Sequence, residues 1–262
     1  MGIQVFTVFS YFVEKLFLFL TLIGSGTSLM KTILDVSPKI NCDQETKFIP
    51  ELLTMREKLL NKFPPTHVSI KSYYNSSHDA IRLFIIKIIE KSDPSYEILC
   101  AKDPYTINYI DYLAELFPNI RVIIMLRDGR AAALSIMTRE NKTLNQKTFF
   151  DYITRWNNAN KNAYDKCEKI GRTNCIFVKY EDLVTKPEKT IRKVLQFVNI
   201  EFEDKFLHHE QQTEAILAYG HNNNTAKKIY QEKLKTWEGF IQYDKSELKK
   251  FEMFSKLGYN LD

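Results

Sequence analysis

Short, continuous apolar runs alternate along this chain with longer segments in which apolar residues recur at helical spacing. Such runs are typical of strands that are buried on both faces of a sheet. The pattern predicts strands at residues 16–23, 98–101, 121–126 and 175–178. It predicts helices at residues 28–36, 49–62, 79–91, 105–117, 131–139, 148–169 and 187–197.

This alternation of strands and helices defines the expected fold class. Strands joined by helical crossovers build a parallel sheet, so we expect an α/β fold with a central parallel sheet flanked by helices. The chain has no internal repeat and no Gly/Ser-rich linker, and residues 1–262 are expected to form a single domain. Ligands of such sheets bind beyond the carboxyl ends of the strands.

The N-terminal apolar segment is too short to cross a membrane. Its longest uninterrupted run, residues 16–23, has eight residues, and a bilayer requires about 20. No basic region precedes this run, which argues against a signal peptide. We interpret residues 16–23 as a buried strand and residues 1–15 as an atypical extension, with no clear transmembrane anchor.

The charge and the histidine and cysteine patterns exclude some partners. The formal net charge of +5 suits an anionic ligand or an acidic substrate, although a solvated basic surface explains it as well. No basic run is dense enough to predict nucleic-acid binding. The histidines are scattered and no CxxC pair is present, so no metal site is expected.

The four cysteines leave several pairings open. Cys167 and Cys175 flank a predicted turn between a helix and a strand, a layout that could close a small disulfide loop. Cys42 and Cys100 would then form the second pair. Four cysteines allow three connectivities, and four buried thiols in a cytosolic protein are the alternative.

Three sequons for N-glycosylation favour an oxidising compartment. They begin at Asn75, Asn141 and Asn223. Each is weak evidence by itself, because the pattern often arises by chance. Together with an even number of cysteines, they favour the lumen of the secretory pathway.

A glycine-containing turn follows the first predicted strand and leads directly into a helix. Its residues are Gly24, Ser25, Gly26, Thr27 and Ser28. Glycines let backbone N–H groups approach an anion, and the helix N-terminus adds the positive end of its dipole. The turn lacks the lysine of a Walker A loop, and a plain turn with a helix cap explains it about as well.

A second set of candidate anion ligands follows the strand at residues 121–126. Arg127 ends that strand, and Ser135 and Arg139 lie four residues apart on the next predicted helix, on one face. Arginine is suited to forked contacts with phosphate oxygens. The alternative is that Arg139 pairs with Asp128 or Glu140 on the surface.

Several motifs occur in the order found in the protein-tyrosine sulfotransferases, and the chain resembles that family from about residue 24 to residue 259. They are CDQETKFIP (42–50), AKDPY (101–105), LFPN (116–119), MLRDGRA (125–131), RWN (155–157), VKYEDLV (178–184) and HHE (208–210). The resemblance implies the sulfotransferase fold, a P-loop-like nucleotide-binding architecture. It also implies transfer of a sulfuryl group from 3′-phosphoadenosine 5′-phosphosulfate (PAPS) to tyrosine hydroxyls of secreted or membrane proteins, without a metal.

The resemblance assigns two catalytic residues. Glu45 matches the general base of the family, and Lys102 matches the lysine that neutralises charge on the transferring group. A phenol with a pKa near 10 is a poor nucleophile at neutral pH until a base takes its proton. A cation directed at developing negative charge is commonly among the larger contributions to catalysis.

The resemblance also assigns the binding residues. Lys47 replaces a family arginine that contacts acidic substrates. The expected ligands of the nucleotide are Gly24, Ser25, Gly26, Thr27 and Ser28 at the 5′-phosphosulfate, Arg127, Ser135 and Arg139 at the 3′-phosphate, Tyr180, and Lys227 or Lys228. The loop before that lysine is shorter and does not match the family, so the resemblance assigns no residue to its serine; Thr225 is a candidate.

The family pairs its cysteines at the positions of Cys42 with Cys100 and of Cys167 with Cys175. This pairing would hold the Glu45 segment beside the Lys102 segment. The resemblance further implies the Golgi lumen or another part of the secretory pathway, and a homodimer.

Two departures from the family weaken the assignment. Ile23-Gly24 stand in place of Pro-Arg, and Glu51 stands in place of a substrate-binding arginine. Either residues 1–23 are an incorrect start, or this is a diverged member. A PAPS-binding pseudoenzyme and a sulfotransferase for a carbohydrate or small-molecule hydroxyl are the alternative functions.

Overall fold

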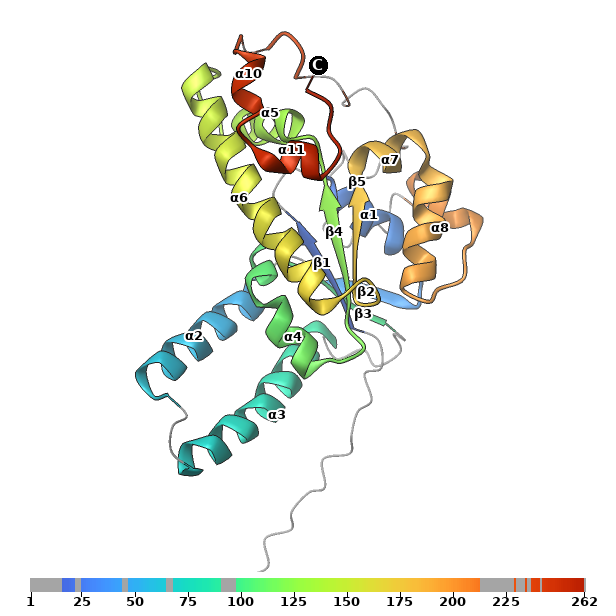
Figure 1. Ribbon diagram of the computed structural model, residues 1–262. Coiled ribbons are helices and arrows are strands. Elements are labelled where there is room, and N and C mark those ends of the chain that lie inside the picture. The colour runs from blue at the N-terminus through green and yellow to red at the C-terminus, as the bar shows by residue number, and fades with distance from the viewer. Residues whose placement is uncertain are drawn as a thin grey trace, which may run out of the picture.

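The structure, a computed structural model, describes residues 16–21, 25–43, 47–64, 68–90, 98–212, 229, 234, 237–240 and 242–261. Its strands form a five-stranded sheet in the order β2-β3-β1-β4-β5, and every neighbouring pair is parallel (Figure 1). The strands are β1 (Leu16–Thr21), β2 (Ile40–Asp43), β3 (Ile98–Lys102), β4 (Arg121–Leu126) and β5 (Cys175–Lys179). The predicted fold class and the four predicted strands are confirmed.

Strand β2 was not predicted from the sequence. Its four residues, Ile-Asn-Cys-Asp, alternate apolar and polar side chains and give no continuous apolar run. The strand lies at one edge of the described sheet, where such alternation is tolerated because only part of the strand faces the core.

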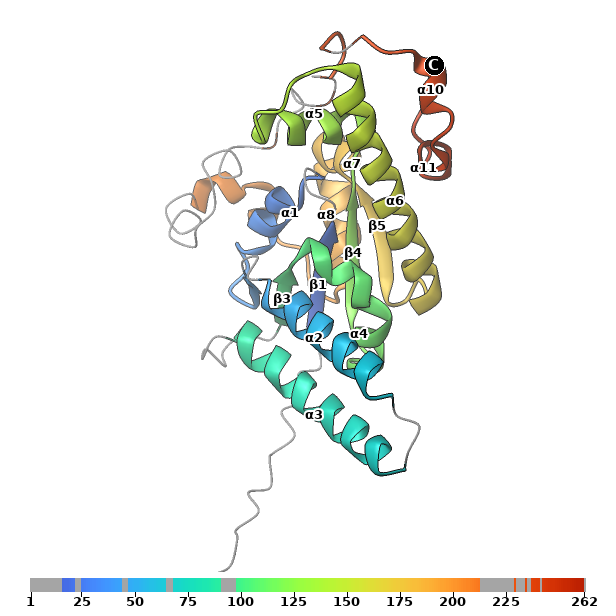
Figure 2. The ribbon, with the colours of Figure 1, turned by 90° about the vertical axis from the view of Figure 1, so that its left-hand side faces the viewer.

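The described helices flank the sheet on both faces. They are α1 (Thr27–Leu34), α2 (Phe48–Lys62), α3 (Val68–Glu90), η1 (Pro104–Tyr109), α4 (Ile110–Leu116), α5 (Gly129–Arg139), α6 (Gln146–Ile170), α7 (Tyr180–Thr185), α8 (Pro187–Phe197), η2 (Asp204–Leu207), η3 (His209–Gln212), α10 (Lys245–Leu248) and α11 (Glu252–Lys256). Helices α2 and α3 project from the end of the sheet opposite α5 and α11, as Figures 1 and 2 both show. None of the helices in the described ranges is both long and apolar enough to cross a bilayer.

The predicted helices differ from these in two places. Helix α3 begins at Val68 and not at residue 79, because its first turns are polar and carry no apolar period. The segment predicted as one helix at residues 105–117 is a 3₁₀ turn followed by α4, because Asp103 caps the turn and Pro104 occupies its first position.

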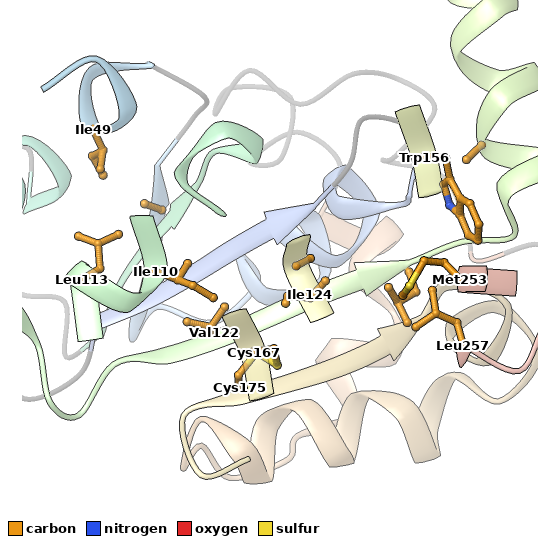
Figure 3. Packing of buried hydrophobic residues seen from close by; sticks show 14 of the residues in the cluster. Ile49, Ile110, Leu113, Val122, Ile124, Trp156, Cys167, Cys175, Met253 and Leu257 are labelled. Carbon is orange, nitrogen blue, oxygen red and sulfur yellow. A yellow bond between two sulfur atoms is a disulfide. The ribbon is translucent and has the colours of Figure 1, made fainter. Parts of the chain in front are cut away.

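The sheet separates two hydrophobic clusters. Along β4, Val122 and Ile124 belong to the cluster that packs against α2 to α6 and α11, and Ile123 and Met125 belong to the cluster that packs against α1 and α8. Figure 3 shows Val122 and Ile124 among side chains from α4, α6 and α11. Alternate residues of a strand point to opposite faces, so both faces of this sheet are buried.

Both predicted disulfides are present, and the alternative of four buried thiols is wrong. Cys42 and Cys100 are register partners on β2 and β3, with their Cα atoms 4.2 Å apart. Cys167 of α6 is bonded to Cys175 of β5 within the hydrophobic core, with Cα atoms 5.5 Å apart.

The sequons lie in different settings. Asn75 is within α3, and Asn141 is exposed in the turn after α5, with a φ of +50°. Asn223 lies outside the described residues. Glycosylation of the three sites stays a prediction.

Candidate active site

Candidate residues from across the sequence follow the carboxyl ends of four adjacent strands. Ser25 and Gly26 follow β1, Lys102 is the last residue of β3, and Arg127 and Tyr180 directly follow β4 and β5. In Figure 1 the arrows of β4 and β5 point toward the end of the sheet where α5 and α7 begin. Strand β1 is central: the chain runs from it to β2 on one side and later crosses from β3 to β4 on the other, the change of direction at which ligands bind in parallel sheets.

The turn after β1 has two features that suit a bound anion and that a plain helix cap does not require. Gly26 is the N-cap of α1 and has a φ of +89°, and its side chain position is occupied by the ring of Tyr180. A Cβ atom there would lie 2.4 Å from Cδ2 of that ring. Ser25 is 1% exposed, and its buried Oγ has no hydrogen-bond partner in the structure. A buried hydroxyl without a partner is costly, and a bound phosphate oxygen would satisfy it.

Tyr180 joins this turn to the end of β4. The guanidinium of Arg127 lies over the Tyr180 ring, 4.5 Å from its centroid, and both residues are buried. One tyrosine therefore contacts the two segments that were predicted as separate anion sites. The structure brings these two sites together, as the parallel-sheet prediction requires.

The first turn of α5 is fixed by a network of buried polar groups. Asp128 caps α5 and accepts two hydrogen bonds from the Arg130 guanidinium, at 3.0 and 2.6 Å. The backbone N–H of Asp128 donates to Glu181 at 2.9 Å, and burial raises the pKa of this glutamate above its usual value. Near the C-terminus, the Tyr259 hydroxyl donates to Glu181 at 3.3 Å, and the Asn260 carbonyl accepts from Arg130 at 2.7 Å.

No role was predicted for Arg130 or Glu181. Both lie in motifs of the resemblance, but their importance depends on contacts with residues far along the chain, which no local pattern reports. Their positions, four and two residues after a strand end, were the only available signal. In the structure they hold the segment that carries Arg127.

Ser135 and Arg139 are exposed on α5, as expected of side chains that would contact a ligand. The alternative pairing of Arg139 is wrong for both carboxylates. Asp128 is bonded to the arginine two residues after it, and Glu140 accepts a hydrogen bond from the Tyr152 hydroxyl at 2.6 Å. Arg139 forms no ion pair with any residue that the structure describes.

Lys102 lies beside the central strand, as the register partner of Phe19 on β1. The next residue, Asp103, is buried and accepts a hydrogen bond from the backbone N–H of Lys47 at 3.2 Å. Lys47 is exposed, with a φ of +61°, and begins α2. The disulfide of Cys42 with Cys100 attaches the chain to β3 before residues 44–46. The hydrogen bond from Lys47 to Asp103 attaches it next to the end of β3 after them.

The predicted site residues Gly24, Glu45, Thr225 and Lys227 or Lys228 lie outside the described residues. Their roles stay predictions. Within the described ranges, no group of three or more His, Cys, Asp or Glu side chains is arranged to hold a metal ion.

The sequence model of the sulfotransferase family matches residues 22–204, which include four of the five strands and all the described strand-end residues. The chain therefore belongs to the sulfotransferase family. Within that family, its sequence is similar to the protein-tyrosine sulfotransferases, and the resemblance read from the motifs is confirmed.

The similarity to these relatives covers part of each protein. Protein-tyrosine sulfotransferase A of Caenorhabditis elegans is 38% identical over 195 residues, and protein-tyrosine sulfotransferase 2 of Gallus gallus is 35% identical over 193 residues. Both alignments cover 71% of this chain, and they cover 50% and 52% of those proteins. The chain thus spans about half the length of the curated relatives it matches.

Solved structures confirm the fold. The sulfotransferase domains of the Synechococcus PCC 7002 olefin synthase and of the curacin biosynthetic pathway each match with a TM-score of 0.66 and 16% identity. Each match covers 95% of this chain, and 95% and 98% of those domains. At this identity the likeness establishes the sulfotransferase fold alone.

Proposed function

We propose that this chain transfers the sulfuryl group of PAPS to tyrosine hydroxyls of secreted or membrane proteins, with a preference for acidic sequence around the tyrosine. The names of the similar relatives support the tyrosine acceptor. The contact of Tyr180 with both Gly26 and Arg127 carries the proposal, because it unites two anion-binding strand ends into one nucleotide site. A mouse sulfotransferase of similar fold, with a TM-score of 0.50 and 13% identity, was solved in complex with PAP.

The reaction gives each catalytic residue a defined task. Glu45 takes the phenolic proton while the tyrosine oxygen forms a bond to sulfur. The bond between sulfur and the bridging oxygen of the 5′-phosphate breaks, and PAP leaves with that oxygen. Lys102 stabilises the negative charge that develops on the bridging oxygen, where a fixed cation needs no reorganisation.

The remaining residues bind the two substrates. Residues 25–28, with Gly24 before them, hold the 5′ side of the nucleotide through the Ser25 hydroxyl and the N-terminus of α1. Lys227 or Lys228 closes over PAPS. Arg127, Ser135 and Arg139 hold the 3′-phosphate, with Tyr180 between the two groups. Lys47, exposed at the start of α2, contacts acidic residues of the substrate protein.

We also propose that the chain works in the Golgi lumen or elsewhere in the secretory pathway. Two disulfides support an oxidising compartment, since cytosolic proteins rarely keep such bonds. The exposed turn at Asn141 is suited to carry a glycan.

The test of the proposed function is sulfate transfer from labelled PAPS to an acidic peptide that contains tyrosine. Glu45→Ala is expected to lower kcat by at least about 10²-fold, because the phenol loses its general base. PAP affinity, measured by calorimetry, is expected to stay unchanged, since Glu45 serves the acceptor. Glu45→Gln keeps the shape of the side chain without the base and is expected to be equally slow.

Two outcomes would contradict the proposal. Wild-type protein that binds PAP without any transfer would be a nucleotide-binding pseudoenzyme, the alternative that Gly24 in place of the family arginine favours. Transfer to a carbohydrate or a small phenol, with none to the peptide, would show that the acceptor belongs to another class of molecule.

Gly26→Ala is expected to weaken PAP binding by about tenfold or more, because the new methyl group would displace the Tyr180 ring from the nucleotide site. Gly171→Ala is the matched control. Gly171 has a similar φ of +83°, but a Cβ atom there meets nothing within 4 Å. Calorimetry should show normal PAP affinity for Gly171→Ala, and normal affinity for both variants would contradict the role of the Gly26–Tyr180 contact.

A further inference from the structure

A basic cleft of about 610 Å³ lies along β5, and its lining includes Leu126 and Lys179, which directly precede Arg127 and Tyr180 of the candidate active site. Strand β5 is at one edge of the described sheet, and the cleft is lined by residues of β5, the C-terminal half of α6 with its following turn, α8 and α11. Asp182 is the only acidic residue among the lining residues. Six basic side chains line the cleft: Arg172, Lys179, Lys186, Lys189, Lys193 and Lys256. None of the residues expected to bind the nucleotide is among them.

Much of this positive charge is uncompensated. Lys186, Lys189 and Lys193 form no ion pair with any residue that the structure describes, and all three are exposed. Lys189 and Lys193 are four residues apart, so they lie on one face of α8. Arg172 differs, because it pairs with Glu168 on the surface of α6. The cleft therefore attracts an anionic partner.

The cleft also presents the outer backbone of β5, which no other strand of the described sheet pairs. The carbonyl of Asn174 accepts from Val122 of β4 at 2.7 Å, and backbone groups alternate in direction along a strand. The carbonyl of Phe177, three residues on, therefore points away from β4. It accepts a hydrogen bond from Nζ of Lys193 at 3.3 Å, which confirms that this edge faces the cleft.

An apolar surface lies beside this edge. The rings of Phe177 and Tyr164 are stacked, with centroids 5.6 Å apart, and both residues are half-buried. Cations, the backbone of an edge strand and a pair of stacked aromatic rings within one cleft match the chemistry of an extended acidic peptide, which carries carboxylates and backbone groups together.

We propose that this cleft binds an extended acidic segment of a polypeptide, which lies along the free edge of β5. Lys193 exchanges its contact with the Phe177 carbonyl for a carboxylate of the segment, so that the backbone of Phe177 can pair with the segment. Lys186 and Lys189 contact further carboxylates. If the proposed function holds, the segment belongs to a sulfation substrate. The chain then binds its substrate protein at a second place, separate from the site of transfer.

Binding of a labelled peptide tests the proposal without catalysis. The probe is a fluorescein-labelled acidic peptide of about ten residues with alternating Glu and Val and no tyrosine. Lys189→Glu with Lys193→Glu is expected to weaken its binding by about tenfold or more, because two attractive contacts become repulsive. The matched control is Lys58→Glu with Lys62→Glu, two exposed lysines equally spaced on α2, which should leave the affinity unchanged.

A second probe separates strand addition from simple charge attraction. Replacing alternate valines of the peptide with proline keeps its charge but removes backbone donors, and is expected to abolish most of the binding. Equal binding of the proline peptide would overturn the strand geometry. Tight binding of a sulfated glycan that depends on Lys189 and Lys193, with no binding of the acidic peptide, would overturn the polypeptide partner. No effect of the α8 substitutions would mean that these lysines only shield the strand edge.

Transfer kinetics test the link to the proposed function. For a tyrosine peptide with a long acidic extension, the α8 double variant is expected to raise KM by about tenfold and to leave kcat unchanged. For a short tyrosine peptide, neither constant should change. Peptide binding that depends on α8, combined with an unchanged KM for the long peptide, would overturn the substrate role while the docking site stands.

Discussion

Lys102→Ala is expected to lower the rate of sulfuryl transfer by about 10³-fold, with little change in PAP affinity. Lys102 ends β3 beside the central strand and is half-buried, so it lies at the strand ends where the nucleotide is proposed to bind. The cation is needed when charge develops on the bridging oxygen, and its loss acts on the transition state more than on the bound nucleotide. Single-turnover transfer from labelled PAPS, with PAP calorimetry alongside, measures both quantities.

Lys102→Arg provides the comparison. It keeps the charge but spreads it over a planar group with different reach, and we expect an intermediate rate. Lys47→Ala is a second control, because Lys47 is assigned to the acceptor and should change KM for the acidic peptide instead of kcat. A fall in kcat of less than threefold for Lys102→Ala would contradict the assigned role.

Removal of the Cys42–Cys100 disulfide is expected to destabilise the chain more than removal of Cys167–Cys175. The first bond spans 58 residues and the second spans eight. Loop-closure entropy in the unfolded chain then gives about 4 kcal/mol for the first and about 2.5 kcal/mol for the second. Urea unfolding of the two double-alanine variants measures the difference.

The two pairs are well matched for this comparison. All four cysteines are buried, so the cavity left by each double substitution is similar. A larger loss for the Cys167–Cys175 pair would contradict the loop-closure explanation and point to packing in the cluster of Figure 3. We also expect loss of the first pair to lower transfer more, because this bond attaches the segment before Glu45 to the strand that ends in Lys102.

The sequence predicted which residues lie together at the site because a parallel sheet places the residues that follow its strands at one end. Continuous apolar runs at β1, β4 and β5 predicted parallel strands, and parallel strands place Ser25, Arg127 and Tyr180 at one end of a sheet. The resemblance supplied the roles of these residues. The disulfide pairing also came from the resemblance, since four cysteines alone left three connectivities open.

Other features could not be read from local patterns. The contact between Gly26 and Tyr180 depends on the strand order, which places β4 and β5 on the same side of β1. Strand β2 is too short and too polar to give a continuous run. The last described segment has no periodic pattern, yet Tyr259 and Asn260 hydrogen-bond with Glu181 and Arg130.

Those last contacts impose an order on biosynthesis. The turn that carries Arg127 is supported by residues more than 120 positions later, for example the carbonyl of Asn260 that accepts from Arg130 with a sequence separation of 130. A chain emerging from the ribosome can form the sheet and the disulfides before these residues have been made. The nucleotide site acquires its final support only when synthesis of residues 259 and 260 is complete, so a nascent chain stalled before that point could have a paired sheet but would be poorly able to hold PAPS.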